Sequence, residues 1–282
     1  MDVWTSNHGA SRVDKLAAMA DSVVPRPAAT VLTLRDGANG YEILMLRRNV
    51  LSDFMGGAYV YPGGAVDEED GDDDLAYGLN DRIASARLGV TEGGLAYYVA
   101  SLRELFEEAG LLIACNNDGE PARFTERSDL ERLAAQRRAL NAGELRFVDM
   151  LREEKLRVDL RGVAYLAHWV TPVGLPRRYD TRFFVALAPA GQLATHDAGE
   201  TVDDQWVRPV EALAAHARGE FTMMPPTLRN MEAVANLPHA HDVLAYARSL
   251  GPVAAIRPRA VPRDGGPEIL LPGDEGFDDD EG

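Results

Sequence analysis

Residues 101–110 read SLRELFEEAG, and at helical spacing the stretch places its apolar side chains on one side and three glutamates, Glu104, Glu107 and Glu108, on the other. Gly110 is expected to end the helix in the left-handed conformation. Glu107 and Glu108 then lie in the final turn, where a helix carries partial negative charge. Each acid there costs roughly 0.3–1 kcal/mol, and each like-charge pair at i, i+3 or i+4 adds about 0.2–0.5 kcal/mol. Local electrostatics therefore disfavour this sequence.

A solvated acidic face is the ordinary interpretation of such a helix. A face that served only solubility would mix in lysines and would be acidic at the helix start, whereas this one is acidic at its end, with only Arg103 nearby. Hard cations such as Mg2+ or Mn2+ bind carboxylate oxygens and offset their mutual repulsion. The pattern therefore predicts that Glu104, Glu107 and Glu108 hold Mg2+ or Mn2+.

The composition is typical of a soluble globular protein of 282 residues, 46% of them hydrophobic. Two acidic runs, DEEDGDDD at 67–74 and DEGFDDDEG at 274–282, account for all but −3 of the net charge of −16. Such a chain is poorly suited to a nucleic-acid backbone, and it has no apolar run of about 18 residues that would span a membrane. The start without a secretory signal and the single Cys115, expected to be buried, favour the cytoplasm.

Apolar alternation and turn residues predict a mixed sheet flanked by helices. AATVLTLR and YEILMLRR, separated by DGANG, are typical of a hairpin, and AYVYPGGAV is typical of two short strands around a tight turn. Further strands are expected at 111–114, at VAYLAHWVTP, at DTRFFVALAP and at 206–209. Helices are expected at about 95–109, 126–141, 144–156, 210–218, 226–236 and 239–250. This is the pattern of an α/β layered domain with helical additions.

The domain organisation follows from shifts in composition along the chain. We expect an N-terminal helix and linker over 1–25 and one domain over 26–250, with insertions at about 71–94 and 120–158. The segment 251–282 is rich in Pro, Gly and acids and is expected to be a disordered acidic tail.

The glycines at 63–64 and the stretch RELFEEAGL at 103–111 resemble the Nudix box of the Nudix hydrolases. That pattern runs glycine, five residues, glutamate, seven residues, then Arg-Glu-aliphatic-x-Glu-Glu-x-Gly-aliphatic, and its second half matches at every specified position. In the first half the expected glutamate falls on Asp70, and 32 residues instead of seven separate it from Arg103. Either the loop docks normally while the insertion bulges outward, or the acid of the loop has no role. We favour the first. Asp67 and Asp70 are weak site candidates, since an acidic run is usually solvated surface.

A second resemblance indicates which group of Nudix hydrolases the chain is similar to. YEILMLRRNVLSDFMGGAYVYPGGAVD, PRRYDTRFFVA and MMPPTLRNM are similar to the acyl-CoA diphosphatases of animal peroxisomes and their bacterial relatives, over about 26–235. The resemblance implies a Nudix-like α/β/α sandwich with a mixed sheet, helical insertions and a helical C-terminal extension. It implies a metal-dependent diphosphatase that hydrolyses CoA or acyl-CoA to 3',5'-ADP and (acyl)phosphopantetheine, and dimers are common in the family. An ADP-ribose/NADH-type dinucleotide diphosphatase and a non-catalytic nucleotide-binding module are the alternatives.

The resemblance also implies roles for the residues of the box. The positions of Glu107 and Glu108 are principal metal ligands in the family, the position of Glu104 is a further ligand that can also act as a base, and Arg103 orients the acids. An ordinary i, i+4 ion pair between Arg103 and Glu107 is compatible with that role. Gly63 and Gly64 are expected at the substrate.

Other candidates lie outside the box. The general base is often on a later loop, and ETVDDQW at 200–206 offers Glu200 or Asp204, of which we favour Glu200, although loop acids in solvent are as common. Arg48 and Arg182 are expected to bind the phosphates of the substrate, because a guanidinium group binds phosphate in bidentate fashion.

Overall fold

The computed structural model describes residues 23–49, 56–196, 201–261 and 268–277. The chain divides into two units, which we describe separately. The larger unit comprises Pro27–His168 and Thr181–Ala254 and contains the Nudix-like box. The smaller comprises Met1–Arg26, Trp169–Asp180 and Ala255–Gly282.

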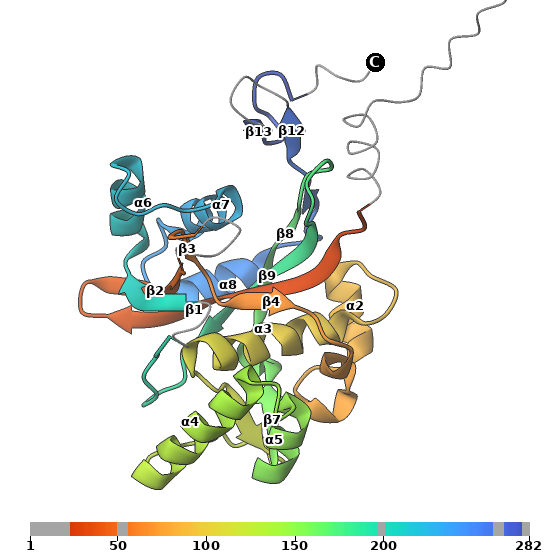
Figure 1. The fold of residues 1–282 in the computed structure, drawn as a ribbon, viewed down its shortest axis with the longest axis vertical. Helices are drawn as coiled ribbons and strands as arrows, with labels where there is room; N and C mark the ends of the chain where they lie inside the picture. Colours follow the sequence, from red (N-terminus) through yellow and green to blue (C-terminus); the bar gives the residue numbers. More distant parts are fainter. Residues whose placement is uncertain (1–22, 50–55, 197–200, 262–267, 278–282) are drawn as a thin grey trace, which may run out of the picture. The chain divides into compact units, whose positions relative to one another are not determined.

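The predicted hairpin is confirmed and forms the centre of the main sheet. Strand β1 (Arg26–Gly37) pairs antiparallel with β2 (Gly40–Arg48), with Leu34 opposite Ile43. The predicted short strands are β3 (Tyr59–Val60), which pairs with β2, and β4 (Gly63–Ala65), which pairs with β1. The order of the longer strands is β10–β2–β1–β9–β8 (Figure 1), where β8 is Ala164–Val170, β9 is Tyr179–Leu187 and β10 is Thr201–Val207.

Both faces of this sheet are buried, because successive side chains of a strand point to opposite faces. Val31, Leu44 and Phe184 belong to the hydrophobic core that the sheet shares with α3 (Gly94–Ala109). Their neighbours Leu32 and Ile43 are equally inaccessible to solvent but lie outside that core. Helices α7 (Pro225–Val234) and α8 (Ala240–Ser249) bury apolar residues of their own and are bonded to the hairpin, where Tyr41 Oη donates to Val234 O and Ala240 N donates to Asp36 Oδ1. Two helical layers therefore enclose the sheet, and the predicted α/β/α sandwich is confirmed.

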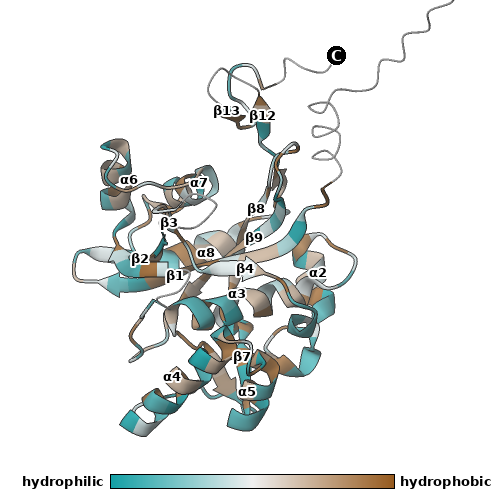
Figure 2. Cartoon of the chain, viewed as in Figure 1, coloured by the Kyte–Doolittle hydropathy of each residue, from teal (hydrophilic) through white to brown (hydrophobic). Residues whose placement is uncertain are grey.

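The helices predicted between residues 95 and 250 are confirmed, each within a few residues, and the helix predicted within 1–25 lies outside the described residues. The helices not yet given are α2 (Asp81–Leu88), α4 (Arg127–Asn141), α5 (Phe147–Glu154) and α6 (Pro209–Ala217). Helix α4 is mainly hydrophilic (Figure 2) and buries only Leu133 and Leu140. No helix in the described part of the chain is long and apolar enough to cross a lipid bilayer.

A second, three-stranded sheet joins the two insertions. Its order is β5–β7–β6, with β5 (Ala76–Tyr77) parallel and β6 (Ala114–Asn116) antiparallel to β7 (Leu156–Asp159). Short 3-10 turns at Glu68–Gly71, Asp73–Leu75 and Leu160–Gly162 complete these regions. Cys115, in β6, is buried as expected.

Two strand predictions were wrong in their limits. Leu111 and Leu112 are buried as expected, but the strand begins only at Ala114. The reason is that the Gln192 side chain takes the place of a neighbouring strand: its Oε1 accepts from Leu112 N at 2.8 Å and its Nε2 donates to Leu112 O at 2.9 Å. The strand predicted at 206–209 is the longer β10, because the polar residues before Trp206 pair with β2.

The smaller unit contains the ends of β8 and β9 and three short strands, β11 (Ala255–Ile256), β12 (Arg259–Val261) and β13 (Glu268–Leu270). Strands β12 and β13 pair with each other. They lie within the segment for which a disordered tail was predicted. The predicted limits of the domain, 26–250, and of the tail, 251–282, stay predictions.

Candidate active site

Arg103 is the centre of the site, and it is almost fully buried. Its Nε and Nη2 donate to the two carboxylate oxygens of Asp70 at 2.9 and 3.0 Å, a bidentate pair. Its Nη1 donates to Glu104 Oε1 at 2.9 Å and to Glu107 Oε2 at 3.1 Å, and Nη2 also donates to Ala65 O at 2.8 Å. One guanidinium group thus joins α3, β4 and the acidic loop that follows β4.

The bidentate pair decides between the two alternatives for the first half of the box. Asp70 is only 2% exposed, and besides Arg103 it accepts from Asp67 N at 2.8 Å. Asp67 itself is largely exposed and lies 3.4 Å from Arg103. The acidic loop after β4 therefore docks on α3 through Asp70, the position at which the box pattern has its glutamate. The inserted residues follow Asp70 and lead away from the site.

The two glycines at 63–64 bring the backbone of β4 against the glutamates. Gly63 N donates to Glu108 Oε2 at 3.0 Å. A Cβ atom on Gly64 would lie 2.4 Å from Glu104 Oε1, so any side chain there would displace that carboxylate. A Cβ on Gly63 would instead meet the backbone of β1, 2.5 Å from Ala29 O. Both glycines are required by close approach, and the structure gives them contacts with the glutamates.

The glutamates lie in a cluster in which charge is costly. Burial raises the pKa of the Glu104 carboxyl to about 7, with the charge of Arg103 opposing the shift and the charge of Glu107 adding to it. Burial also raises the pKa of Glu107, again against Arg103. Arg103 alone therefore does not neutralise the cluster that the sequence places at this helix end.

Each end of α3 is capped by one of the two insertions. At the start, Asp81 of α2 accepts from Gly93 N and Leu95 N, and Ser85 Oγ accepts from Gly94 N. At the end, two side chains of α4 donate to the carbonyl of Glu107, Arg137 Nε at 2.8 Å and Asn141 Nδ2 at 3.1 Å. Gly110 adopts the predicted left-handed conformation with φ of 71°. The sequence offered no local signal for these caps, because they reach α3 from outside its own stretch of chain.

The three glutamates fit a divalent cation by donor chemistry, since carboxylate oxygens on one helix face are the ligands that hard cations prefer. Within the described ranges, however, no three His, Cys, Asp or Glu side chains are grouped so that they could hold a metal ion as they stand. Arg103 lies between Glu104 and Glu107, and Glu108 is turned to Gly63. In this arrangement the glutamate oxygens are engaged by Arg103 and by the backbone of Gly63.

The candidates outside the box are placed differently from one another. Arg48 ends β2, and its Nε is buried and finds no hydrogen-bond partner in the described part of the chain. Arg182 is 4% exposed, with its guanidinium 5.3 Å from the centre of the Tyr97 ring of α3. Asp204 accepts from both N and Nδ1 of His196. Glu200 lies outside the described residues, so its predicted role as the base stays a prediction.

Comparison with known proteins gives the same family as the box. The sequence model of the NUDT19 Nudix domain matches residues 91–234, about half of the chain. The chain belongs to the NUDT19 Nudix family. It is therefore a Nudix hydrolase, of a family whose members generally need divalent cations.

Relatives extend the similarity over most of the chain. The acyl-coenzyme A diphosphatase NUDT19 of Xenopus laevis is 24% identical over 280 residues, which cover 87% of this chain and 74% of that protein. The human protein of the same name is 26% identical, with 84% and 72% covered. Among solved structures, a NUDIX hydrolase from Alicyclobacillus acidocaldarius superposes with a TM-score of 0.66 at 27% identity, and the match covers 82% of this chain and all of that one.

Proposed function

We propose that this Nudix hydrolase is a Mg2+- or Mn2+-dependent diphosphatase that cleaves CoA or acyl-CoA. Water adds across the P–O–P bond, and the products are 3',5'-ADP and phosphopantetheine or its acyl form. The observation that carries the reaction type is the set of Glu104, Glu107 and Glu108 around buried Arg103 on one helix. The choice of substrate is supported by the names of the NUDT19 relatives, which are similar over most of their length.

The negative charge of the three glutamates means that an anionic diphosphate can bind there only together with cations. A diphosphate would be repelled by three carboxylates. Glu104, Glu107 and Glu108 would hold the divalent cations, which would supply compensating positive charge and activation of a water. The protein's own contribution is positioning. Arg103 holds Glu104 and Glu107 through one nitrogen while Asp70 fixes the other side of the guanidinium.

Arginines are proposed to bind the rest of the substrate. Arg48 has a buried Nε without a hydrogen-bond partner among the described residues, which suits a ligand oxygen. Arg182 is proposed as a second phosphate contact and Glu200 as the general base. A homodimer and a cytoplasmic location also stay predictions.

The test is a substrate panel with the purified full chain. CoA, acyl-CoA esters, ADP-ribose, NADH and dNTPs are each incubated with Mg2+, with Mn2+ or with a chelator, and the products are identified by mass spectrometry. We expect metal-dependent release of 3',5'-ADP from CoA or its esters and much slower turnover of the others.

Three outcomes would contradict parts of the proposal. Turnover of ADP-ribose or NADH but not of CoA esters would favour a dinucleotide diphosphatase. Turnover of nothing in the panel would favour a non-catalytic nucleotide-binding module. Activity that survives in Glu107→Gln at the wild-type level would place the reaction at another site or in a contaminant.

A further inference from the structure

A cavity of about 460 Å3 is lined by one face of α4 and lies against the end of α3 that carries the glutamates. The lining residues of α4 stand three or four positions apart and therefore share one helix face: Leu130, Leu133, Ala134, Arg137, Arg138 and Asn141. Phe106 and Gly110 at the end of α3 and the segment 191–196 supply the other walls, all within the larger unit. The volume suits part of a small organic ligand.

The lining of this cavity changes from polar to apolar along α4. Arg137 and Asn141 both donate to the Glu107 carbonyl, so the polar half of the lining adjoins the last turn of α3. Leu130 is at the other extreme, because at the helical rise of about 1.5 Å per residue it lies roughly 16 Å along α4 from Asn141. The apolar half of the cavity is therefore the half farther from the glutamates.

Leu193 projects from a segment that is fixed in place. The side chain is 83% exposed and lines the cavity. Before it, the Gln192 side chain bonds both N and O of Leu112, and after it, Thr195 N donates to Ala109 O at 2.9 Å. The exposure of Leu193 is thus imposed by bonds on both sides of it.

A second exposed leucine lines the same cavity, since Leu130 is 48% exposed. Two large apolar side chains held in water at one cavity are typical of a site that an apolar group covers. None of the described residues that line the cavity is acidic, and Arg137 and Arg138 both contribute to its wall. The cavity therefore does not repel a substrate that is anionic elsewhere.

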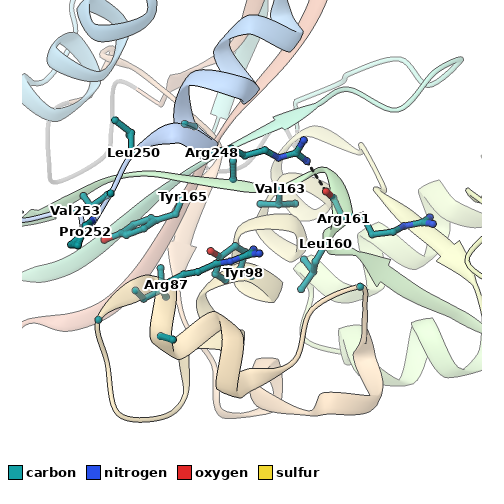
Figure 3. A pocket seen from close by; sticks show the side chains of 17 residues that line it. Arg87, Tyr98, Leu160, Arg161, Val163, Tyr165, Arg248, Leu250, Pro252 and Val253 are labelled. Atoms are coloured by element: carbon teal, nitrogen blue, oxygen red, sulfur yellow. Dashed lines mark hydrogen bonds between the residues drawn. The ribbon is translucent and has the colours of Figure 1, made fainter.

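A larger cavity, of about 740 Å3, lies nearer the start of α3, but its polar groups are engaged within the protein (Figure 3). Arg248 Nη2 donates to the Arg161 carbonyl at 2.7 Å, and the Tyr98 hydroxyl faces the Arg87 side chain. Of the two cavities, the one along α4 adjoins the end of α3 at which the substrate is proposed to react.

We propose that the cavity along α4 binds the acyl chain of an acyl-CoA substrate, with the chain between Leu130 and Leu193. This inference rests on the function proposed above and names the part of the substrate that α4 selects. In acyl-CoA a pantetheine arm with two neutral amides separates the diphosphate from the acyl thioester. A diphosphate at the glutamates therefore places the arm at the polar half of the cavity and the acyl chain at the apolar half.

The test compares CoA, acetyl-CoA and octanoyl-CoA as substrates of the full chain with Mn2+. The KM for octanoyl-CoA is expected to be lower than that for acetyl-CoA by about tenfold or more, because the longer chain removes more methylene groups from water. Leu130→Ser and Leu193→Ser should each raise the KM for octanoyl-CoA about fivefold, since each removes part of the apolar wall. Both variants should leave kcat and KM for CoA unchanged.

Val210→Ser is the matched control, because Val210 is an exposed apolar residue of α6 that does not line the cavity. It should leave the kinetics of all three substrates unchanged. The two leucine variants should keep the wild-type melting temperature without substrate, since both side chains are exposed in the folded protein.

The inference alone is overturned if CoA is cleaved but octanoyl-CoA is not preferred, or if the leucine variants change CoA and octanoyl-CoA alike. It is also overturned if those variants dissociate a dimer in size-exclusion chromatography without changing the chain preference, because the cavity would then be an interface between copies. Turnover of neither CoA nor its esters would overturn the proposed function, and the inference with it.

Discussion

Both ends of α3 have side chains from an insertion bonded to their free backbone groups, but the acidic residues at the two ends have opposite effects. At its start, a carboxylate from α2 meets the free backbone N–H groups, which is the charge that a helix start favours. At its end, Arg137 and Asn141 of α4 meet a carbonyl, yet three glutamates add the charge that a helix end disfavours.

The difference lies in whether the fold stabilises the charged form of the acids at each end. The hydrogen bonds from Leu95 N and Gly93 N lower the pKa of Asp81, so the acid at the start is stabilised as a charge by the fold itself. Burial instead raises the pKa of Glu104 and Glu107 at the end, so the fold disfavours the charged form of those acids. A group that the fold disfavours and yet retains is a candidate for chemistry.

The largest effect is expected from removing the charge that holds Arg103. Asp70→Asn leaves the buried guanidinium without its bidentate partner and should lower the free energy of unfolding by about 3–5 kcal/mol. Urea denaturation measures this. The matched control is Asp67→Asn, because Asp67 is exposed and should contribute less than about 1 kcal/mol. Equal losses from the two variants would show that Asp70 is only part of a solvated acidic run.

Glu107→Gln should separate function from stability at the end of α3. Turnover of the preferred substrate should fall on the order of 10²–10³-fold, because the change removes a proposed metal ligand and its charge. The melting temperature in metal-free buffer should stay the same or rise, since a buried like charge is removed. Glu153→Gln, in an exposed position of α5, is the control. A large drop in metal-free stability would make Glu107 a structural residue.

The neighbouring glycines should respond differently to the same change. Gly64→Ala places a Cβ against the flexible Glu104 carboxylate, so activity should fall roughly tenfold to 10²-fold while the melting temperature changes little. Gly63→Ala places a Cβ against the backbone of Ala29 and Thr30 and should mainly destabilise the protein. Parallel kcat and melting measurements test the pair. Unchanged activity in Gly64→Ala would mean that the observed position of Glu104 is not the active one.

Asp81→Asn tests the start of the helix and should cost about 1–2 kcal/mol of stability at neutral pH, as loss of an N-terminal cap does. Because its folded pKa is below the unfolded value of about 3.9, Asp81 stabilises the protein above that pH, and the contribution is lost as the pH falls through the folded pKa. The stability gap between wild type and variant, followed by thermal melts from pH 7 to pH 3, should therefore close in acid. A gap that is constant with pH would show that the charge is irrelevant.

The smallest effect is expected from the cap at the end of α3. Arg137→Ala removes one of two donors to the Glu107 carbonyl and should cost about 0.5–1 kcal/mol, with Asn141 retaining the other bond. Arg138→Ala, at an exposed neighbouring position, should cost less. A loss from Arg137→Ala larger than that from Asp81→Asn would reverse the comparison of the two ends.

Much of the fold was predictable because its elements are set by local patterns. The hairpin of β1 and β2 followed from apolar alternation and a glycine turn, and the limits of α3 followed from its stripe and Gly110. Residues 111–113 have the apolar content of a strand but precede β6, because the side chain of Gln192, far along the chain, bonds the backbone of Leu112. Hydropathy records burial and does not record which group supplies the hydrogen bonds.

The sequence by itself determined that three glutamates share one face at the end of a helix, since helical spacing alone brings residues three and four apart together. Only the tertiary structure decided that Asp70 is the partner of Arg103 and that side chains from two insertions complete the ends of α3. Contacts between residues separated by an insertion depend on how the chain folds back. No local sequence pattern specifies which distant residues this brings together.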